Sequence, residues 1–204
     1  LEVQNLIINF KTKKYFKNII NNISFGLEKN QILCIVGESG CGKTITTLSI
    51  LGLLPKSIEK KINGKINYKK ENLLNYSENK LRQIRGNEIS MIFQEPTTSL
   101  NPSMKVGKQI SEVIKLHRKL KNKEIKQEVI DILNNVNIYD PERVYSEYPH
   151  SLSGGMKQRI MIGIALACNP NILIADEPTT ALDVTIQAQI LDLMMSLKDK
   201  RDDA

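Results

Sequence analysis

The stretch Gly37-Glu38-Ser39-Gly40-Cys41-Gly42-Lys43-Thr44 fits the pattern G-x-x-x-x-G-K-[ST] at every fixed position. An apolar run at 32–36 precedes it and predicts a buried strand, and residues 44–54 predict a helix that Pro55 stops. Glycines let such a loop point its backbone N–H groups inward at phosphate oxygens, and the N-terminus of the following helix adds partial positive charge. The sequence therefore predicts a phosphate-binding loop.

The last two residues of this stretch have side chains suited to a nucleotide triphosphate. We expect Lys43 to reach the β- and γ-phosphates and the Thr44 hydroxyl to ligate Mg²⁺, while the backbone of residues 37–42 surrounds the phosphates. The predicted ligands of this loop are therefore a nucleotide triphosphate and Mg²⁺.

The charge of the chain is uneven. The 204 residues have a net charge of +7, but residues 1–70 hold twelve Lys, four Glu and no Asp or Arg, a surplus of eight positive charges. A basic N-terminal third could meet nucleic acid or an anionic membrane surface, or it could be a solvated face of a lysine-rich chain. No nucleic-acid-binding pattern accompanies it, and no apolar run approaches the roughly 20 residues of a membrane span.

Cysteine usage favours a reducing compartment. Cys34, Cys41 and Cys168 show no C-x-x-C spacing, and a reduced, cytoplasmic setting explains them most simply. Cys41 occupies a variable position of the loop pattern, so it receives no chemical role.

The remaining pattern alternates strands and helices. Expected strands are 1–10, 19–27, 64–68, 89–93 and 172–175, and expected helices are 79–84, 106–120, 123–135, 151–168 and 184–198. Tyr15 and Phe16 lie in a basic turn at 11–18, where either ring could stack on adenine or pack within a hairpin. Residues 97–152 are helical in pattern and read as an insertion in an α/β domain.

Carboxylates follow the buried strand at 172–175. Asp176 is placed to hold Mg²⁺ from the side opposite Thr44, and Glu177 could accept a proton from the attacking water. Glu177 could also be a helix-start carboxylate before Pro178. Gln94 ends the strand at 89–93 and could sense Mg²⁺ or the γ-phosphate, although an isolated Gln is most often a surface residue.

A second anion site is predicted where Ser153, Gly154 and Gly155 begin a helix, because a hydroxyl and bare backbone amides lie at its N-terminus. One nucleotide has only one γ-phosphate. The second site is explained if it meets a nucleotide held by another subunit.

These motifs together resemble one family. The set GESGCGKT (37–44), Gln94, LSGGMKQR (152–159), ILIADE (172–177) and Ala181-Leu182-Asp183 resembles the ATP-binding-cassette (ABC) ATPases, and LSGG separates that family from other phosphate-loop proteins. The stretches FQEPTTSLNP (93–102), YPHSLSGGM (148–156) and DEPTTALDVTIQAQIL (176–191) are similar to the oligopeptide/dipeptide/nickel importer branch.

The resemblance implies an α/β fold: a P-loop NTPase (RecA-like) core with an N-terminal antiparallel β region and a helical insertion subdomain. One ABC ATPase domain would span 1–204, with 1–96 and 157–204 as nucleotide-binding core and 97–156 as helical signature subdomain. It also implies a head-to-tail dimer in which loop 37–44 of one chain and residues 153–155 of the other enclose ATP.

The implied site residues include those already named. Glu177 would be the catalytic base, acting with Lys43 and Gln94, and the Mg²⁺ ligands would be Thr44, Gln94 and Asp176. Asp183 would couple the two sites, and Tyr15 or Phe16 would stack on adenine. The family's γ-phosphate histidine has no match, since His117 and His150 lie elsewhere, so we expect a domain incomplete at its C-terminus.

The implied partners are a second ABC ATPase subunit, identical or related, and an integral membrane permease at the cytoplasmic face of the membrane. An extracytoplasmic substrate-binding protein would act indirectly, and no nucleic acid is expected. The cargo, peptide or nickel, stays open. Two alternatives remain: a soluble ABC-type ATPase that acts on nucleic acid or ribosomes, and a non-catalytic fragment.

Overall fold

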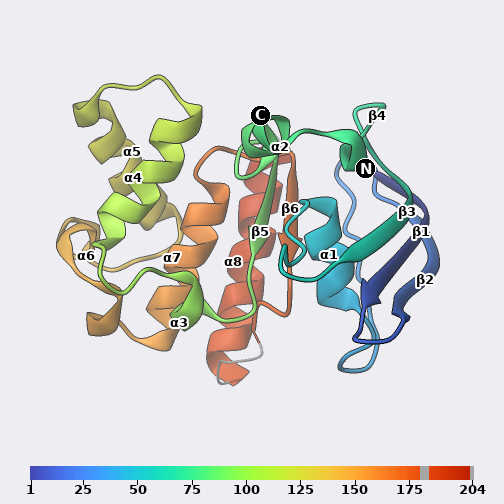
Figure 1. The fold of residues 1–204 in the computed structure, drawn as a ribbon. Coiled ribbons are helices and arrows are strands. Elements are labelled where there is room, and N and C mark those ends of the chain that lie inside the picture. The colour runs from blue at the N-terminus through green and yellow to red at the C-terminus, as the bar shows by residue number, and fades with distance from the viewer. Residues whose placement is uncertain (180–183, 203–204) are drawn as a thin grey trace. The chain divides into compact units, whose positions relative to one another are not determined.

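A computed structural model describes residues 1–179 and 184–202 (Figure 1). The chain divides into two compact units, Leu1–Arg82 and Gln83–Ala204. The first carries an antiparallel sheet and the phosphate loop. The second carries a parallel strand pair among helices, so the α/β class is confirmed.

The first unit is built on a four-stranded antiparallel sheet. Its strands are β1 (Glu2–Lys11), β2 (Phe16–Gly26), β3 (Lys60–Tyr68) and β4 (Glu71–Asn72), in the order β2-β1-β3-β4. The β1–β2 turn is shorter than expected because Thr12 N–H donates to the Tyr15 carbonyl at 2.8 Å. A register shift between Val3 and Leu6 interrupts the period of two along β1, and the sheet buries apolar side chains: Val3, Leu6, Ile8, Ile20 and Ile66.

Helix α1 (Lys43–Ile50) follows the phosphate loop and ends before the expected stop at Pro55. Gly52 takes a left-handed conformation with φ 63°, which allows Leu53 N–H to donate to the Leu48 carbonyl at 2.9 Å. Gly52 N–H also donates to the Ser49 carbonyl at 3.1 Å, which completes a Schellman motif. A glycine, rather than the proline, therefore ends this helix.

The strand predicted at 32–36 is absent from the structure, and that prediction was wrong. Residues 31–38 have no regular secondary structure, and the Ile32 and Val36 side chains are 65% and 84% exposed. An apolar run forms a buried strand only where a neighbouring strand accepts its backbone hydrogen bonds. Each ladder of the described sheets joins other strands, so this run has no such neighbour.

The second unit contains two parallel strands, β5 (Ile89–Ile92) and β6 (Ile172–Ala175), paired with Ile89 opposite Ile172. Its helices are α2 (Glu78–Ile84, which begins in the first unit), α3 (Pro96–Ser99), α4 (Val106–His117), α5 (Asn122–Asn135), α6 (Pro141–Ser146), α7 (Gly154–Leu166) and α8 (Val184–Asp202). Short 3₁₀ turns lie at Leu73–Asn75 in the first unit and Pro149–Ser151 in the second. The helix-rich character expected for 97–152 is confirmed.

Two features of these helices differ from expectation. The sequence pattern did not predict the short helix α6, which begins with Asp140 as its N-cap and Pro141 as its first residue. Helix α7 begins at Gly154 rather than near 151, because the Ser153 hydroxyl accepts from Met156 N–H at 3.3 Å and caps it.

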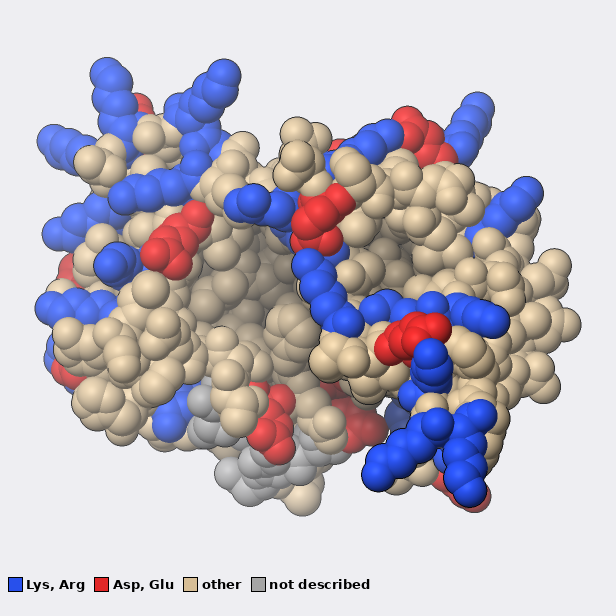
Figure 2. All heavy atoms as spheres, viewed as in Figure 1, with Lys and Arg blue, Asp and Glu red and all other residues tan. Residues whose placement is uncertain are grey.

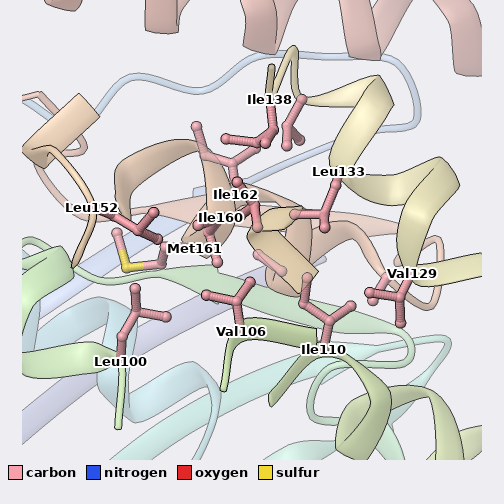
Figure 3. Close-up of a cluster of buried hydrophobic side chains, with 14 of the residues drawn as sticks. Leu100, Val106, Ile110, Val129, Leu133, Ile138, Leu152, Ile160, Met161 and Ile162 are labelled. Carbon is pink, nitrogen blue, oxygen red and sulfur yellow. The ribbon is translucent and has the colours of Figure 1, made fainter. Parts of the chain in front are cut away.

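The core of the second unit lies where α4, α5 and α7 meet (Figure 3). The side chains at its centre are fully buried: Val106, Ile110, Val129, Leu133, Ile160 and Ile162. Gly107 belongs to this packing, since a Cβ there would lie 2.3 Å from the Tyr145 ring. Among the described residues, no helix combines the length and apolar character that a bilayer span requires.

Candidate functional site

The phosphate loop needs glycine at two described positions. Gly40 and Gly42 have φ of 78° and 104°, in the left-handed region that side chains disfavour. A Cβ at Gly42 would also lie 2.4 Å from Ile20 Cδ1 on β2. Gly42 is the N-cap of α1 and forms no side-chain cap hydrogen bond.

Lys43 folds back over the loop that precedes it. Its Nζ donates to the carbonyl oxygens of Gly37 at 2.9 Å and Glu38 at 3.0 Å. The Cys41 N–H donates to the Glu38 backbone carbonyl at 3.3 Å and tightens the same turn. The ammonium therefore lies against the loop backbone, with Thr44 following it in the first turn of α1.

The two aromatic candidates for an adenine platform differ in their surroundings. Tyr15 lies in the β1–β2 turn with 64% of its side chain exposed. Phe16 begins β2, and the Lys61 ammonium lies 4.4 Å from the centre of its ring. Tyr15 offers an open face, whereas one face of Phe16 already has a cation over it.

Parallel pairing brings Gln94 and the two carboxylates together in the second unit. Asp176 N–H donates to the Ile92 carbonyl at 3.0 Å, so the chain beyond β6 stays beside the chain beyond β5. Gln94 Nε2 then donates to Glu177 Oε2 at 2.8 Å, although the two residues are 83 positions apart. Asp176 is 6% exposed and Glu177 is partly buried.

The backbone at Glu177 is unusual. Its φ of 47° lies in the left-handed region, where a residue with a side chain is disfavoured. Such a conformation persists only where the surroundings hold it, and it is found preferentially at functional sites. Here the hydrogen bond from Gln94 is one of the contacts that hold it.

The predicted second anion site lies at the N-terminus of α7. Ser153 caps the helix with its hydroxyl, and Ser153 and Gly154 are exposed. Gly155 lies close to α8, since a Cβ there would be 3.2 Å from Ile186 Cγ2. A serine hydroxyl and glycine backbone are therefore presented at the positive end of a 13-residue helix.

The predicted site residues are divided between the two units. The loop residues 37–44 and Tyr15 lie in the first unit, and Gln94, Ser153–Gly155 and Asp176–Glu177 lie in the second. Ala181, Leu182 and Asp183, with the proposed role of Asp183 in coupling, lie outside the described residues. In 1–179 and 184–202, no three His, Cys, Asp or Glu side chains gather as metal ligands.

Sequence reasoning assigned no role to Gln158 and Arg159, which lie within the quoted stretch 152–159. Gln158 is 1% exposed, and its Nε2 donates to the Pro178 carbonyl at 2.6 Å. Arg159 donates to the Val136 carbonyl at 3.2 Å and to Gln189 at 3.1 Å. Their place one turn into a helix that begins with a glycine pair was the available signal.

Titratable groups with displaced pKa values lie outside these positions. Burial lowers the pKa of His117, partly opposed by a hydrogen bond with the Arg85 backbone. Burial also raises the pKa of the Cys168 thiol. Neither group belongs to the predicted site.

Comparison with known proteins is consistent with this geometry. The family model of the ABC transporters matches residues 20–180. A probable peptide ABC transporter ATP-binding protein, y4tR of Sinorhizobium fredii, is 50% identical over 200 residues, covering 98% of this chain and 60% of that protein. The oligopeptide transport ATP-binding protein AppD of Bacillus subtilis is 51% identical, covering 98% of this chain and 61% of AppD.

The fold agrees as well. The dimeric post-hydrolysis structure of the ATP-binding cassette MJ0796 bound to ADP and Pi has a TM-score of 0.83 at 26% identity, covering 98% of this chain and 83% of that one. The chain spans about three fifths of the length of y4tR and AppD. The matched residues include the phosphate loop, Gln94, the LSGG stretch and the Asp176–Glu177 pair, and the chain therefore belongs to the ABC transporter family.

Proposed function

We propose that the chain is the ATP-binding and ATP-hydrolysing subunit of an importer for oligopeptides or dipeptides. The observation that carries the proposal is the Lys43 ammonium placed against the phosphate loop, in a chain about half identical to peptide-transport ATP-binding proteins. The names of those relatives favour peptides over nickel as the cargo.

ATP would bind through the loop of the first unit. Backbone amides of residues 37–42 and the N-terminus of α1 would receive the phosphates. Lys43 would exchange its two carbonyl acceptors, Gly37 and Glu38, for phosphate oxygens, which accept a charge-assisted hydrogen bond more strongly. The exposed Tyr15 ring is the better placed of the two candidates for stacking on adenine.

The residues proposed for Mg²⁺ are Thr44, Gln94 and Asp176. They fit a hard cation, since each offers an oxygen and Asp176 supplies the anionic one from a nearly buried position. Magnesium, when bound, would neutralise charge on the β- and γ-phosphate oxygens.

Glu177 is the proposed base for hydrolysis. Its carboxylate would accept the proton of the attacking water, which requires it to turn from the Gln94 amide toward that water. Gln94 would then be available to the metal. The hydrogen bond between them therefore describes a resting arrangement that nucleotide binding would change.

The N-terminus of α7 is proposed to contact a nucleotide bound by a second cassette. Support comes from the Ser153 hydroxyl and the glycine backbone at a helix N-terminus, and from the dimer that MJ0796 forms with ADP and Pi. The helical region 97–156 is proposed to dock on a membrane permease at the cytoplasmic face, with an extracytoplasmic binding protein supplying cargo. Closure on ATP and reopening after hydrolysis would drive the permease.

The decisive test uses two substitutions. Lys43→Ala should abolish measurable ATP binding, whereas Lys65→Ala, at an exposed strand position, should leave binding unchanged. Glu177→Gln should retain ATP binding but lower kcat by about 100-fold or more. Glu142→Gln, at an exposed helix start, is its control. Full turnover by the Glu177→Gln protein would contradict the assignment of the base.

One observation favours the alternative of a nucleic-acid-associated ATPase. Lysines gather over the end of the first unit that carries the β1–β2 turn (Figure 2). Fluorescence anisotropy with labelled RNA and DNA at physiological salt tests it. We expect no binding above that of other basic proteins, whereas tight, salt-sensitive binding would favour the alternative.

A further inference from the structure

Gln158 is a buried polar residue whose hydrogen bond spans two functional segments. Its side chain is 1% exposed within the core of the second unit, and its Nε2 donates to the Pro178 carbonyl at 2.6 Å. A buried amide that loses its partner carries the full cost of desolvation, so this hydrogen bond has a strong preference to persist.

The two ends of this hydrogen bond have opposite roles in the proposed function. Gln158 is four residues after Gly154, so it lies one helical turn from the N-terminus that would meet a partner's nucleotide. Pro178 directly follows Glu177, the proposed base for this chain's own nucleotide. One side chain therefore joins the segment facing one ATP to the segment that hydrolyses the other.

The hydrogen bond from Gln158 is accepted by the Pro178 carbonyl, directly after the proposed base Glu177, whose carboxylate must point in a defined direction. Glu177 has the left-handed φ of 47°, and its carboxylate accepts from Gln94 at 2.8 Å. The position of the Pro178 carbonyl therefore constrains the backbone immediately after the strained residue. A shift of about 1 Å in a catalytic group can cost roughly 100-fold in rate. A small displacement of the backbone after Glu177 would therefore lower the rate of hydrolysis.

Helix α7 has the contacts to move as one body around Gln158. Arg159 bonds α7 to the Val136 carbonyl at the end of α5 and to Gln189 on α8. Gly155 allows Ile186 of α8 to approach closely. Displacement of the α7 N-terminus would therefore be passed to Gln158 rather than absorbed by a loose helix.

We propose that Gln158 is a positioning residue that sets the direction of the Glu177 carboxylate and transmits to it the engagement of Ser153–Gly155 by the second nucleotide. The inference rests on the proposed function, because it needs two cassettes that share their nucleotides. It adds to that function a route, within one subunit, from one ATP site to the other.

The test replaces the amide without changing the volume much. Gln158→Met removes the donor but fills the same space, and Ser111→Ala is the matched control. Ser111 is also buried, and its hydroxyl donates to a backbone carbonyl, that of Gly107, at 2.6 Å. Both variants lose one buried hydrogen bond to a carbonyl, so a purely structural role predicts the same result for both.

Three quantities are measured on the full chain: kcat for ATP hydrolysis, its Hill coefficient in ATP, and the Kd for ATP. We expect Gln158→Met to lower kcat at least about tenfold and to bring the Hill coefficient toward one, with the Kd unchanged within about twofold. Ser111→Ala should keep the wild-type kcat and Hill coefficient. A loss of stability alone would lower active protein without altering cooperativity.

Equal kcat and Hill coefficients for Gln158→Met and Ser111→Ala would overturn the inference and leave the proposed function standing. A wild-type chain without turnover or ATP-dependent dimer would overturn the proposed function, and the inference with it. If circular dichroism shows that Gln158→Met does not fold, Gln158→Asn keeps the amide but shortens its reach. It should show the same loss of cooperativity, and wild-type cooperativity in a folded Asn variant would overturn the inference.

Discussion

The two units contain short apolar runs of similar composition with different structures. Residues 89–92 and 172–175 pair with each other as β5 and β6, and all four residues of β5 are buried. Residues 32–36 are equally apolar but form no ladder within 1–179 and 184–202, and Ile32 and Val36 are largely exposed. Both kinds of run lead into a segment of the proposed site, the carboxylates in one case and the phosphate loop in the other.

The difference shows that an apolar run by itself specifies neither burial nor a strand partner. Its backbone N–H and carbonyl groups must also be satisfied, and in a parallel sheet only an adjacent strand can do this. β5 and β6 supply each other with that partner, and they fix Gln94 beside Glu177 as a result. The phosphate loop instead relies on its own glycines and on Lys43 for its shape.

The largest effect is expected from substitutions that compare a buried residue of β5 with an exposed residue of the run 32–36. Ile89→Ala removes a fully buried side chain from β5 and should cost about 2–5 kcal/mol in the free energy of unfolding. Ile32→Ala, at a side chain 65% exposed, should cost about 0.5 kcal/mol or less. Urea unfolding of both variants measures the difference. Equal losses would show that residues 32–36 are paired in solution and would break the comparison.

A smaller effect is expected where a glycine ends the phosphate-loop helix. Gly52→Ala forces a side chain into φ 63° and should destabilise the chain by about 1–2 kcal/mol. Gly26→Ala is the control, since Gly26 has no positive φ and a Cβ there contacts nothing within 4 Å. Thermal unfolding compares them. A neutral Gly52→Ala would show that the first unit contributes little to the measured transition.

The smallest expected effect is the pH dependence of stability that arises from the second unit, which contains both histidines. Burial lowers the pKa of His117 below its ordinary 6.5, so below that pH the unfolded chain binds more protons than the folded one. Stability should therefore fall as pH drops through 6.5 toward the folded pKa. His117→Gln should flatten this dependence of Tm, and His150→Gln, at an exposed position, should keep it. An unchanged slope in His117→Gln would exclude His117 as its source.

Much of the architecture could be read from local pattern. Period-two alternation placed β1, and helical periodicity placed α4, α5 and α8 within a few residues of their bounds. Helix boundaries that depend on capping residues were harder to predict from the sequence. α1 ends earlier than predicted because of Gly52, and α7 begins later than predicted because Ser153 caps it. The short α6 carries too few residues to show a period, so its N-cap Asp140 and Pro141 were its only signals.

By itself, the sequence determined the chemistry: a glycine loop with Lys43 and Thr44, carboxylates after an apolar strand, and an LSGG helix start, which together identify the ABC transporter family. These are local patterns, and each needs only neighbouring residues to be recognised. The tertiary structure alone decided that Gln94 reaches Glu177, that Gln158 holds Pro178, and that the run at 32–36 joins neither of the sheets formed by the described residues. Each of these depends on which distant backbone lies alongside, and a hydrogen bond between residues 83 positions apart leaves no periodicity in either segment.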